Sequence, residues 1–160
     1  MIPKQLVKIA VQTSVDGLSG GSPERLFAVP VEGVHDQFEI HNSPFYAKGI
    51  SYLDVVEAVD DEEAPGHLHY ARTIQGGGHS TYRILIEKGQ PSFPSWWERL
   101  EDTGCTYEFT EEGAHLLYAV DVPPKADIYT VYRILQEGED LGVWTFDEGH
   151  CGHPLRGTNA

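Results

Sequence analysis

The chain has 160 residues, with 11 basic and 25 acidic side chains, so its formal net charge is −14 at pH 7. This charge repels nucleic-acid phosphates and anionic lipid, so we expect neither a nucleic acid nor a membrane as a partner. It favours a basic protein partner, although an acidic composition also serves solubility alone. Hydrophobic residues make up 40% of the chain, which is enough for a packed core and too much for a disordered protein.

The predicted environment is the cytoplasm. Two cysteines, Cys105 and Cys151, are too few for a disulfide framework. The N-terminal residues lack the long apolar stretch and the small-residue cleavage site of a signal peptide. No segment of the sequence reaches the roughly 20 apolar residues of a membrane helix.

The N-terminal half predicts β-structure. A short strand at Leu6–Val11 is followed by a segment rich in Gly, Ser and Asp, from Asp16 to Pro23, that is typical of a mobile connection. Residues 24–77 then predict a small β-barrel-like subdomain, because several short strands follow one another closely. The predicted strands are Arg25–Val31, Gln37–His41, Asp54–Val59 and His67–Ile74. Alternation places Phe27, Val29 and Val31 on one side, and Phe38 and Ile40 inward.

Residues 78–151 predict a ferredoxin-like β-α-β-β-α-β unit, so the expected fold class is α+β. The predicted strands are Ser80–Glu87, Thr106–Thr110, His115–Val122 and Val143–Asp147. The apolar residues expected to face the helices from the first and last strands are Tyr82, Ile84, Ile86, Trp144 and Phe146. Residues 152–160 predict a loose tail.

Two helices are expected between these strands. Ser95 and Glu98 form a capping-box pattern that opens the first helix, and Gly104 is placed to stop it. Asp127 is expected to cap the second helix, which we predict to end near Gly138. The residues predicted to share its apolar face are Ile128, Val131, Tyr132 and Leu135.

The polar face of the predicted sheet offers a candidate binding site. His79, Thr81 and Arg83 alternate with the apolar residues of their strand, and Asp147 lies on the same side of the last strand. The first and last strands of a ferredoxin-like sheet are antiparallel neighbours, so Arg83 and Asp147 can meet. The alternative is a purely structural Arg–Asp pair at a domain junction that begins with the glycine run 76–78.

A catalytic serine is not expected here. His79 and Ser80 are adjacent on a strand and point to opposite faces, so they cannot share a hydrogen bond easily. The sequence contains no nucleophile-elbow pattern. We therefore predict no catalytic residues, although an enzyme with His79 as the proton-transfer group remains the alternative.

A metal site is a weaker alternative. His150, Cys151 and His153 place three possible zinc ligands within four residues, and Cys105, His67 or His69 are candidates for a fourth. No second Cys/His pair has finger-like spacing, and the cluster lies where the chain is expected to fray. We expect a solvated tail there, with no metal and no cofactor.

The segment His41–Ser51 predicts a tight turn on the barrel. Asn42 and Ser51 can bind the backbone around it through their side chains. Phe45 and Tyr46 are expected to hold this loop on the core. Alternatively, these two aromatic side chains recognise a partner, since Phe and Tyr are common interface anchors.

Two runs of residues resemble one bacterial domain-of-unknown-function family. They are Asn42–Ser51, followed by Asp54-Val55-Val56, and Gly78–Arg83, which contain N-x-P-F-[FY]-A-x-G-[IV]-S and G-H-S-T-x-R patterns. The resemblance covers roughly residues 24–151. It implies a small cytoplasmic protein with a barrel followed by an α/β unit, and no established activity. It also implies that Asn42, Asp54, His79, Thr81 and Arg83 are shared features of the family.

The leading functional hypothesis is a non-enzymatic binding protein of the immunity or antitoxin type. Small size, acidity and cytoplasmic character favour direct contact with a basic toxin, whose capture electrostatic steering would accelerate. The alternative is a small enzyme or ligand-binding protein that holds an anionic substrate at the face formed by His79, Arg83 and Asp147.

Overall fold

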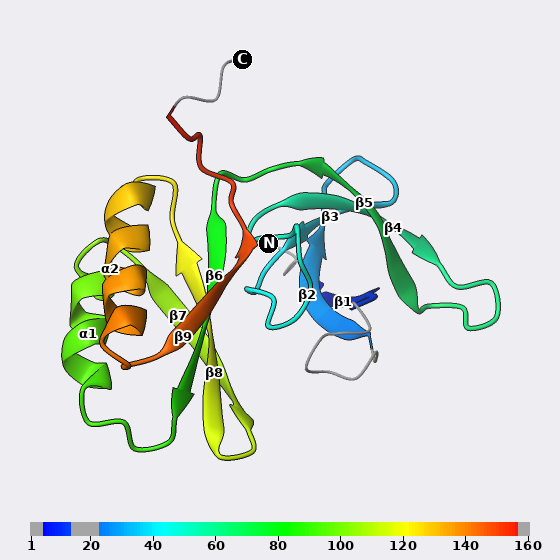
Figure 1. The fold of residues 1–160 in the computed structure, drawn as a ribbon. Helices are drawn as coiled ribbons and strands as arrows, with labels where there is room; N and C mark the ends of the chain where they lie inside the picture. The colour runs from blue at the N-terminus through cyan, green and yellow to red at the C-terminus, as the bar shows by residue number, and fades with distance from the viewer. Residues whose placement is uncertain (1–4, 14–22, 157–160) are drawn as a thin grey trace.

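The computed structural model describes residues 5–13 and 23–156. Five strands close into a barrel, and four further strands form a second sheet with two helices (Figure 1). The chain is therefore an α+β protein with a barrel in its N-terminal part. Most of the predicted mobile segment and the last four residues of the predicted tail lie outside the described residues. Among the described residues, no helix is long and apolar enough to cross a membrane.

The barrel follows the order of the chain. Consecutive strands pair antiparallel, and β1 closes the barrel by pairing in parallel with β5. The strands are β1 (Val7–Val11), β2 (Glu24–Pro30), β3 (Gln37–Ile40), β4 (Val55–Asp60) and β5 (Leu68–Gln75). The barrel therefore begins at Val7, and not at residue 24 as predicted.

The inside of the barrel is small and aliphatic, with a core that includes Ile9, Leu26 and Ile40. Phe27, which alternation places on one side of its strand with Val29 and Val31, is 44% exposed, whereas Leu26 and Ala28 are fully buried, so the inner row of β2 is the other one. This part of β2 is apolar at successive positions, so alternation alone could not select the inner row. The predicted inward orientation of Ile40 is confirmed.

The second sheet has the strand order β7-β8-β6-β9, and all its neighbouring strands are antiparallel. We call this sheet and its two helices the sheet unit. Its strands are β6 (Ser80–Glu87), β7 (Thr106–Glu112), β8 (His115–Val122) and β9 (Thr145–His150). The helices α1 (Phe93–Glu101) and α2 (Ile128–Asp140) cover one face, and the barrel lies on the side of the other (Figure 1). As predicted, Tyr82, Ile84 and Ile86 are buried in the core beneath the helices.

The first helix begins earlier than its capping-box pattern predicts. Ser92, and not Ser95, is the N-cap of α1, and its side chain makes no capping hydrogen bond. Pro94 lies in the first turn, where a backbone N–H has no helical partner, so the proline costs nothing there. The Ser95 hydroxyl instead donates to the Ser92 carbonyl at 3.1 Å. In α2 the predicted cap is confirmed, because Asp127 accepts a hydrogen bond from the Tyr129 amide at 3.0 Å.

The second helix does not end at Gly138, as predicted, but continues to Asp140. Gly138 faces the Trp144 indole so closely that an added Cβ would lie 2.5 Å from the ring. The glycine thus provides space for the indole within the helix and is not a stop signal. Tyr132 is 48% exposed and Ile134 is buried, so the predicted apolar face was wrong at this position.

Candidate functional site

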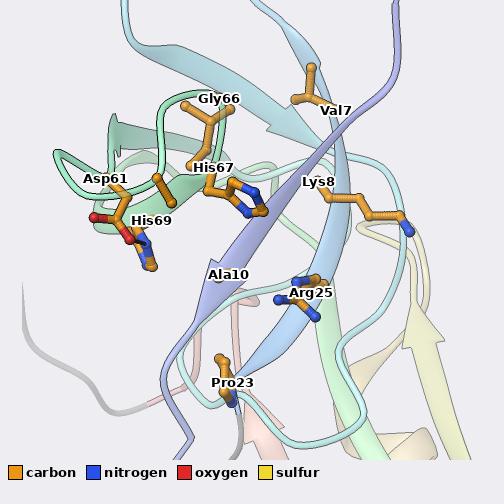
Figure 2. Close-up of a pocket in the computed structure, with 11 residues that line it drawn as sticks. Val7, Lys8, Ala10, Pro23, Arg25, Asp61, Gly66, His67 and His69 are labelled. Carbon is orange, nitrogen blue, oxygen red and sulfur yellow. Dashed lines mark hydrogen bonds and ion pairs between the residues drawn. The ribbon is translucent and has the colours of Figure 1, made fainter.

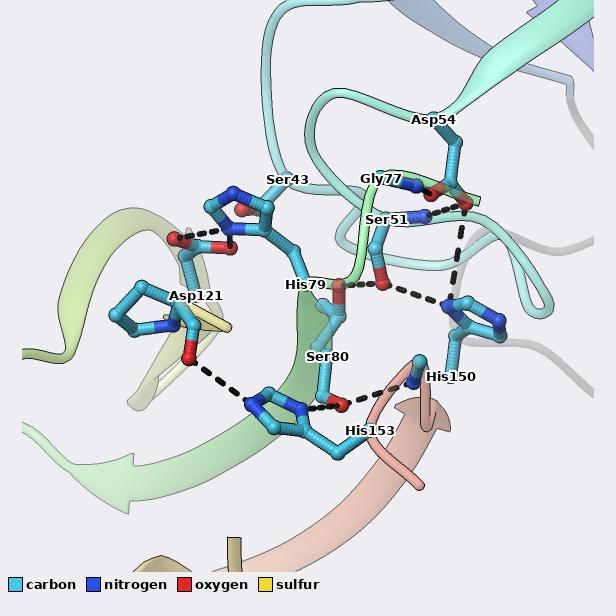
Figure 3. Close-up of polar contacts among 12 residues, drawn as sticks. Ser43, Ser51, Asp54, Gly77, His79, Ser80, Asp121, His150 and His153 are labelled. Atoms are coloured by element: carbon cyan, nitrogen blue, oxygen red, sulfur yellow. Dashed lines mark hydrogen bonds and ion pairs between the residues drawn. The ribbon is translucent and has the colours of Figure 1, made fainter. Parts of the chain in front are cut away.

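Ser51 lies at the centre of a buried polar contact between barrel and sheet unit (Figure 3). Its hydroxyl is 2.7 Å from the Thr81 hydroxyl of β6 and 2.8 Å from Nδ1 of His150 in β9. The Asp54 carboxylate accepts hydrogen bonds from the Ser51 amide at 2.9 Å and from the Gly77 amide at 2.8 Å. Ser51, Asp54 and Thr81 are fully buried. The two units therefore meet through a polar contact that excludes water.

Ser51, His150 and Asp54 share the residue types of a catalytic triad but not its geometry. Asp54 and Ser51 both approach the same imidazole nitrogen, Nδ1, and the carboxylate is 4.0 Å away from it. A triad needs the acid and the nucleophile on opposite nitrogens, so that the acid orients the base. Because Ser51 is also fully buried, a substrate cannot reach its hydroxyl. These residues hold the two units together.

A second serine–histidine pair attaches the segment after β9. The Ser80 hydroxyl lies 2.6 Å from Nδ1 of His153, and Nε2 of that ring lies 2.9 Å from the Pro123 carbonyl. A carbonyl can only accept, so the Nε2 nitrogen of His153 carries a hydrogen and donates it to Pro123. The prediction of a solvated tail was wrong here, because Ser80 and His153 are buried.

The same contacts separate the two histidines that could have shared a metal ion. The His150 ring contacts Ser51, whereas the His153 ring contacts Ser80 and Pro123 (Figure 3). Within residues 5–13 and 23–156, no three His, Cys, Asp or Glu side chains are grouped as ligands for a metal ion.

His79 belongs to a different cluster at the edge of this junction. Its Nδ1 lies 2.9 and 3.0 Å from the two carboxylate oxygens of Asp121 in β8. The rings of His79 and Tyr52 form a T-shaped pair whose centroids are 5.3 Å apart. Burial raises the pKa of Asp121, and the neighbouring His79 partly opposes this effect. His79 is 9% exposed, and its hydrogen bonds to Asp121 are made through Nδ1.

Arg83 and Asp147 meet across β6 and β9, at the pairing that the sequence predicts. Arg83 Nε is 3.5 Å from an Asp147 oxygen, and its Nη1 donates to the Ala47 carbonyl of the barrel at 2.9 Å. The Arg83 side chain is only 5% exposed, whereas that of Asp147 is 59% exposed. Arg83 and Thr81 thus lie in the junction between the two units, and His79 pairs with Asp121 instead of joining them.

Phe45 and Tyr46, the aromatic residues predicted to hold the loop or to contact a partner, are half-buried. Glu24 of β2 accepts hydrogen bonds from the amides of Phe45, Tyr46 and Ala47. Burial raises the pKa of Glu24, although the hydrogen bonds from Ala47 and Phe45 favour its charged form. The Tyr46 hydroxyl donates to Glu112 of β7. The loop is therefore held between β2 and β7.

A cleft of about 430 Å³ opens beside this loop, between barrel and sheet unit; we call it the junction cleft. Its lining from the barrel is His41, Asn42, Ser43 and Tyr52, and from the sheet unit Gly104, Thr106, Tyr107, Glu108, Asp121 and Pro123. Glu108 is exposed and uses one oxygen to accept from the Ser43 amide at 2.8 Å. The carboxylates of Glu108 and Asp121 and the residue Tyr52 therefore border the cleft, whereas the Tyr107 ring packs against Trp97 and Tyr118 on the helix face of the sheet.

Sequence reasoning missed the partners of these residues. Asp121 lies 42 positions from His79, and His150 lies 99 positions from Ser51, so no local spacing connects them. One signal was present, because Asp121 is the only charged residue in the apolar run Leu116–Val122. A single carboxylate in a strand of this kind needs a buried partner.

The fold and site define a small α+β protein whose barrel and sheet unit share a buried polar junction. Residues 24–146 match the family described as a domain of unknown function (DUF4265). The chain belongs to this family.

A hypothetical protein from Neisseria gonorrhoeae, known from a crystal structure, has a similar fold, with a TM-score of 0.67 and 16% sequence identity. The similarity covers 95% of this chain and 98% of that protein. At this identity it concerns the fold alone. No significant match was found among curated proteins.

Proposed function

We propose that this chain is a non-enzymatic acidic binding protein of the immunity or antitoxin type, which neutralises a basic toxin in the cytoplasm by direct contact. The net charge of −14 supports this proposal, because it attracts a basic partner over a long range and accelerates its capture. The observation that carries the proposal is the composition of the junction cleft, which places the carboxylates of Glu108 and Asp121 beside Tyr52.

The cleft suits the cationic side chain of a partner. Glu108 and Asp121 offer carboxylate oxygens to a guanidinium or an ammonium group, and charge-assisted hydrogen bonds are the stronger ones. The aromatic ring of Tyr52 can add a face over which a cation is attracted. A volume of about 430 Å³ accommodates one lysine or arginine side chain with space to spare.

The strand beside the cleft adds a surface for the rest of the partner. β7 is an edge strand of its sheet, so one row of its backbone groups has no neighbouring strand in the part of the chain that the structure describes. Tyr107 and Phe109 on this strand are 40% and 57% exposed. Exposed aromatic side chains near a charged pocket are frequent anchors of protein interfaces. The proposed contact area therefore includes β7 together with the cleft.

The test combines capture from the native lysate with a matched pair of variants. We expect one basic protein to bind the tagged chain at low salt and to be lost at high salt. Glu108→Gln keeps a hydrogen-bond acceptor for the Ser43 amide but removes the charge, and we expect it to weaken binding about tenfold. Glu62→Gln removes the same charge from the exposed turn after β4 and serves as the control.

The proposal fails if the purified partner binds the wild type and the Glu108→Gln form equally well. It also fails if the association rate constant is independent of salt, because steering between net charges is screened by ions. If Glu108→Gln and Glu62→Gln lose the same affinity for the partner, the overall charge, and not the cleft, explains the binding.

The alternative function, an enzyme or binding protein for an anionic substrate at His79, Arg83 and Asp147, has less support. Arg83 is buried and hydrogen-bonded to Ala47, so its guanidinium is not available to a substrate. The His79 side chain is only 11% exposed, and Asp147, which is 59% exposed, carries the wrong charge for an anion. If His79→Gln alters the binding of an anionic ligand, this alternative regains support.

We also propose that the sheet unit is ferredoxin-like. Its elements follow one another as β-α-β-β-α-β, and the sheet order β7-β8-β6-β9 places the first and last strands side by side. This arrangement supports the assignment, because a split βαβ unit requires both features.

A further inference from the structure

A second hollow lies on the outer face of the barrel. It shares no lining residue with the junction cleft. Its volume is about 550 Å³, and it lies where β2, β1 and β5 run side by side (Figure 2). Ala10 of β1 pairs with Arg25 of β2 on one side and with His69 of β5 on the other. Residues paired across neighbouring strands point to the same face, so the small alanine is flanked by two long side chains.

Two more basic side chains line the hollow, one step further along β1 and just before β5. Lys8 lies two residues before Ala10 on the same face, and His67 lies two residues before His69 (Figure 2). Two side chains with a permanent positive charge and two imidazoles thus surround the hollow. In a chain with 11 basic and 25 acidic residues, this grouping opposes the net charge. We call it the cationic hollow.

The positive charge of the hollow is only partly compensated. Of the described residues that line it, only Asp61 carries a carboxylate, and that group accepts hydrogen bonds from His69 and from the Glu63 amide. The Lys8 ammonium lies over the Phe27 ring at 5.4 Å. Arg25 is exposed, and no carboxylate of the described residues forms an ion pair with it.

We propose that the cationic hollow binds the phosphate group of a small phosphorylated molecule, with Arg25 as its principal contact. A guanidinium offers paired N–H groups that match phosphate oxygens, and the imidazoles of His67 and His69 add further donors. The volume lies in the range of small-molecule sites and exceeds what a phosphate group fills, so the remainder of the molecule has space. The charge of −14 disfavours a nucleic acid as the source of the phosphate.

The experiment is a two-dimensional amide NMR titration with inorganic phosphate and, in a parallel arm, with glycerol 3-phosphate, at constant ionic strength maintained with sodium chloride. We expect saturable shifts at the amides around Lys8, Arg25 and His67, with both ligands. Arg25→Ala should weaken binding about tenfold or more, because it removes a charged hydrogen-bond partner. Arg25→Lys keeps the charge, loses the paired N–H groups and should give an intermediate affinity.

Arg72→Ala is the matched control, because Arg72 is an exposed arginine of β5 that pairs with Glu57 and does not line the hollow. The proposal is overturned if neither ligand gives saturable shifts, or if Arg25→Ala and Arg72→Ala weaken binding equally. Since Arg25 is exposed, the variants are expected to fold, and their unperturbed spectra elsewhere verify this. The result does not depend on the proposed binding of a basic protein.

Discussion

The two faces of the sheet in the sheet unit are covered in different ways. On the helix face, large apolar and aromatic side chains pack together, including Tyr82, Trp97 and Trp144. On the barrel face, the buried groups are hydroxyls, imidazoles, carboxylates and the Arg83 guanidinium. Among the described residues, each buried polar side-chain atom has a partner.

This difference determines how each face responds to a mutation. An apolar core can adjust to a change of volume by small shifts, at a cost that depends on how well the site relaxes. A buried polar junction cannot adjust in this way, because removing one partner leaves the other desolvated and unpaired. The comparison predicts that the junction tolerates substitutions less well than the helix face.

The largest effect is expected for Asp54→Ala. The substitution leaves the buried amide of Ser51 and the amide of Gly77 without their acceptor and leaves a cavity at a fully buried position, and we expect the free energy of unfolding to fall by about 3 kcal/mol. Urea unfolding measures this change. The matched control is Asp60→Ala, which removes an exposed carboxylate at the end of β4 and should leave stability nearly unchanged.

Two spectroscopic probes can show whether the junction couples the two units. All three tryptophans, Trp96, Trp97 and Trp144, lie in the sheet unit, so their fluorescence reports on that unit alone. We expect Asp54→Ala to shift the fluorescence transition and the transition of barrel amides by the same amount. A shift confined to the barrel would contradict a junction that stabilises both units.

A smaller effect is expected for Gly138→Ala on the helix face. Alanine is usually better than glycine inside a helix by about 1 kcal/mol. Here the new methyl group would lie 2.5 Å from the Trp144 ring, and such overpacking costs about 1–3 kcal/mol. We therefore expect a net loss of about 1 kcal/mol by urea unfolding, accompanied by a change in tryptophan fluorescence.

The prediction for Gly138→Ala depends on whether the free energy of unfolding falls or rises. A gain in stability would mean that the indole moves aside freely, and that the helix face is looser than the comparison assumes. The control Arg133→Ala alters an exposed position of the same helix and should have little effect.

The smallest perturbation is the chemical labelling of the two thiols. Cys105 is 2% exposed, and burial raises its pKa to about 11, whereas Cys151 is partly exposed. Since the thiolate is the reactive form, we expect a thiol reagent to modify Cys151 quickly and Cys105 only after the helix face opens. In a Cys151→Ser form, the Cys105 rate should increase with urea as unfolding becomes more frequent. Rapid labelling of Cys105 without denaturant would contradict a closed helix face.

Local patterns were sufficient to predict most elements of the fold. The alternation of Tyr82, Ile84 and Ile86 identified the strand and its helix-facing side, and the bounds predicted for β6 and β8 are those in the structure. Asp127 identified the start of α2, because its side chain caps the first turn through residues next to it in sequence. The order of strands and helices in the sheet unit follows from such local signals.

The sequence alone determined the acidity, the α+β class and the approximate positions of most strands, because composition and periodicity are properties of neighbouring residues; the last strand, predicted at Val143–Asp147, lies at Thr145–His150. Only the tertiary structure decided which polar side chains meet. Ser51 contacts His150, Ser80 contacts His153, and His79 contacts Asp121, each across many residues. These pairings depend on how the barrel, the sheet and the segment after β9 pack together, since desolvation forces each buried polar group to find a partner that local spacing does not specify.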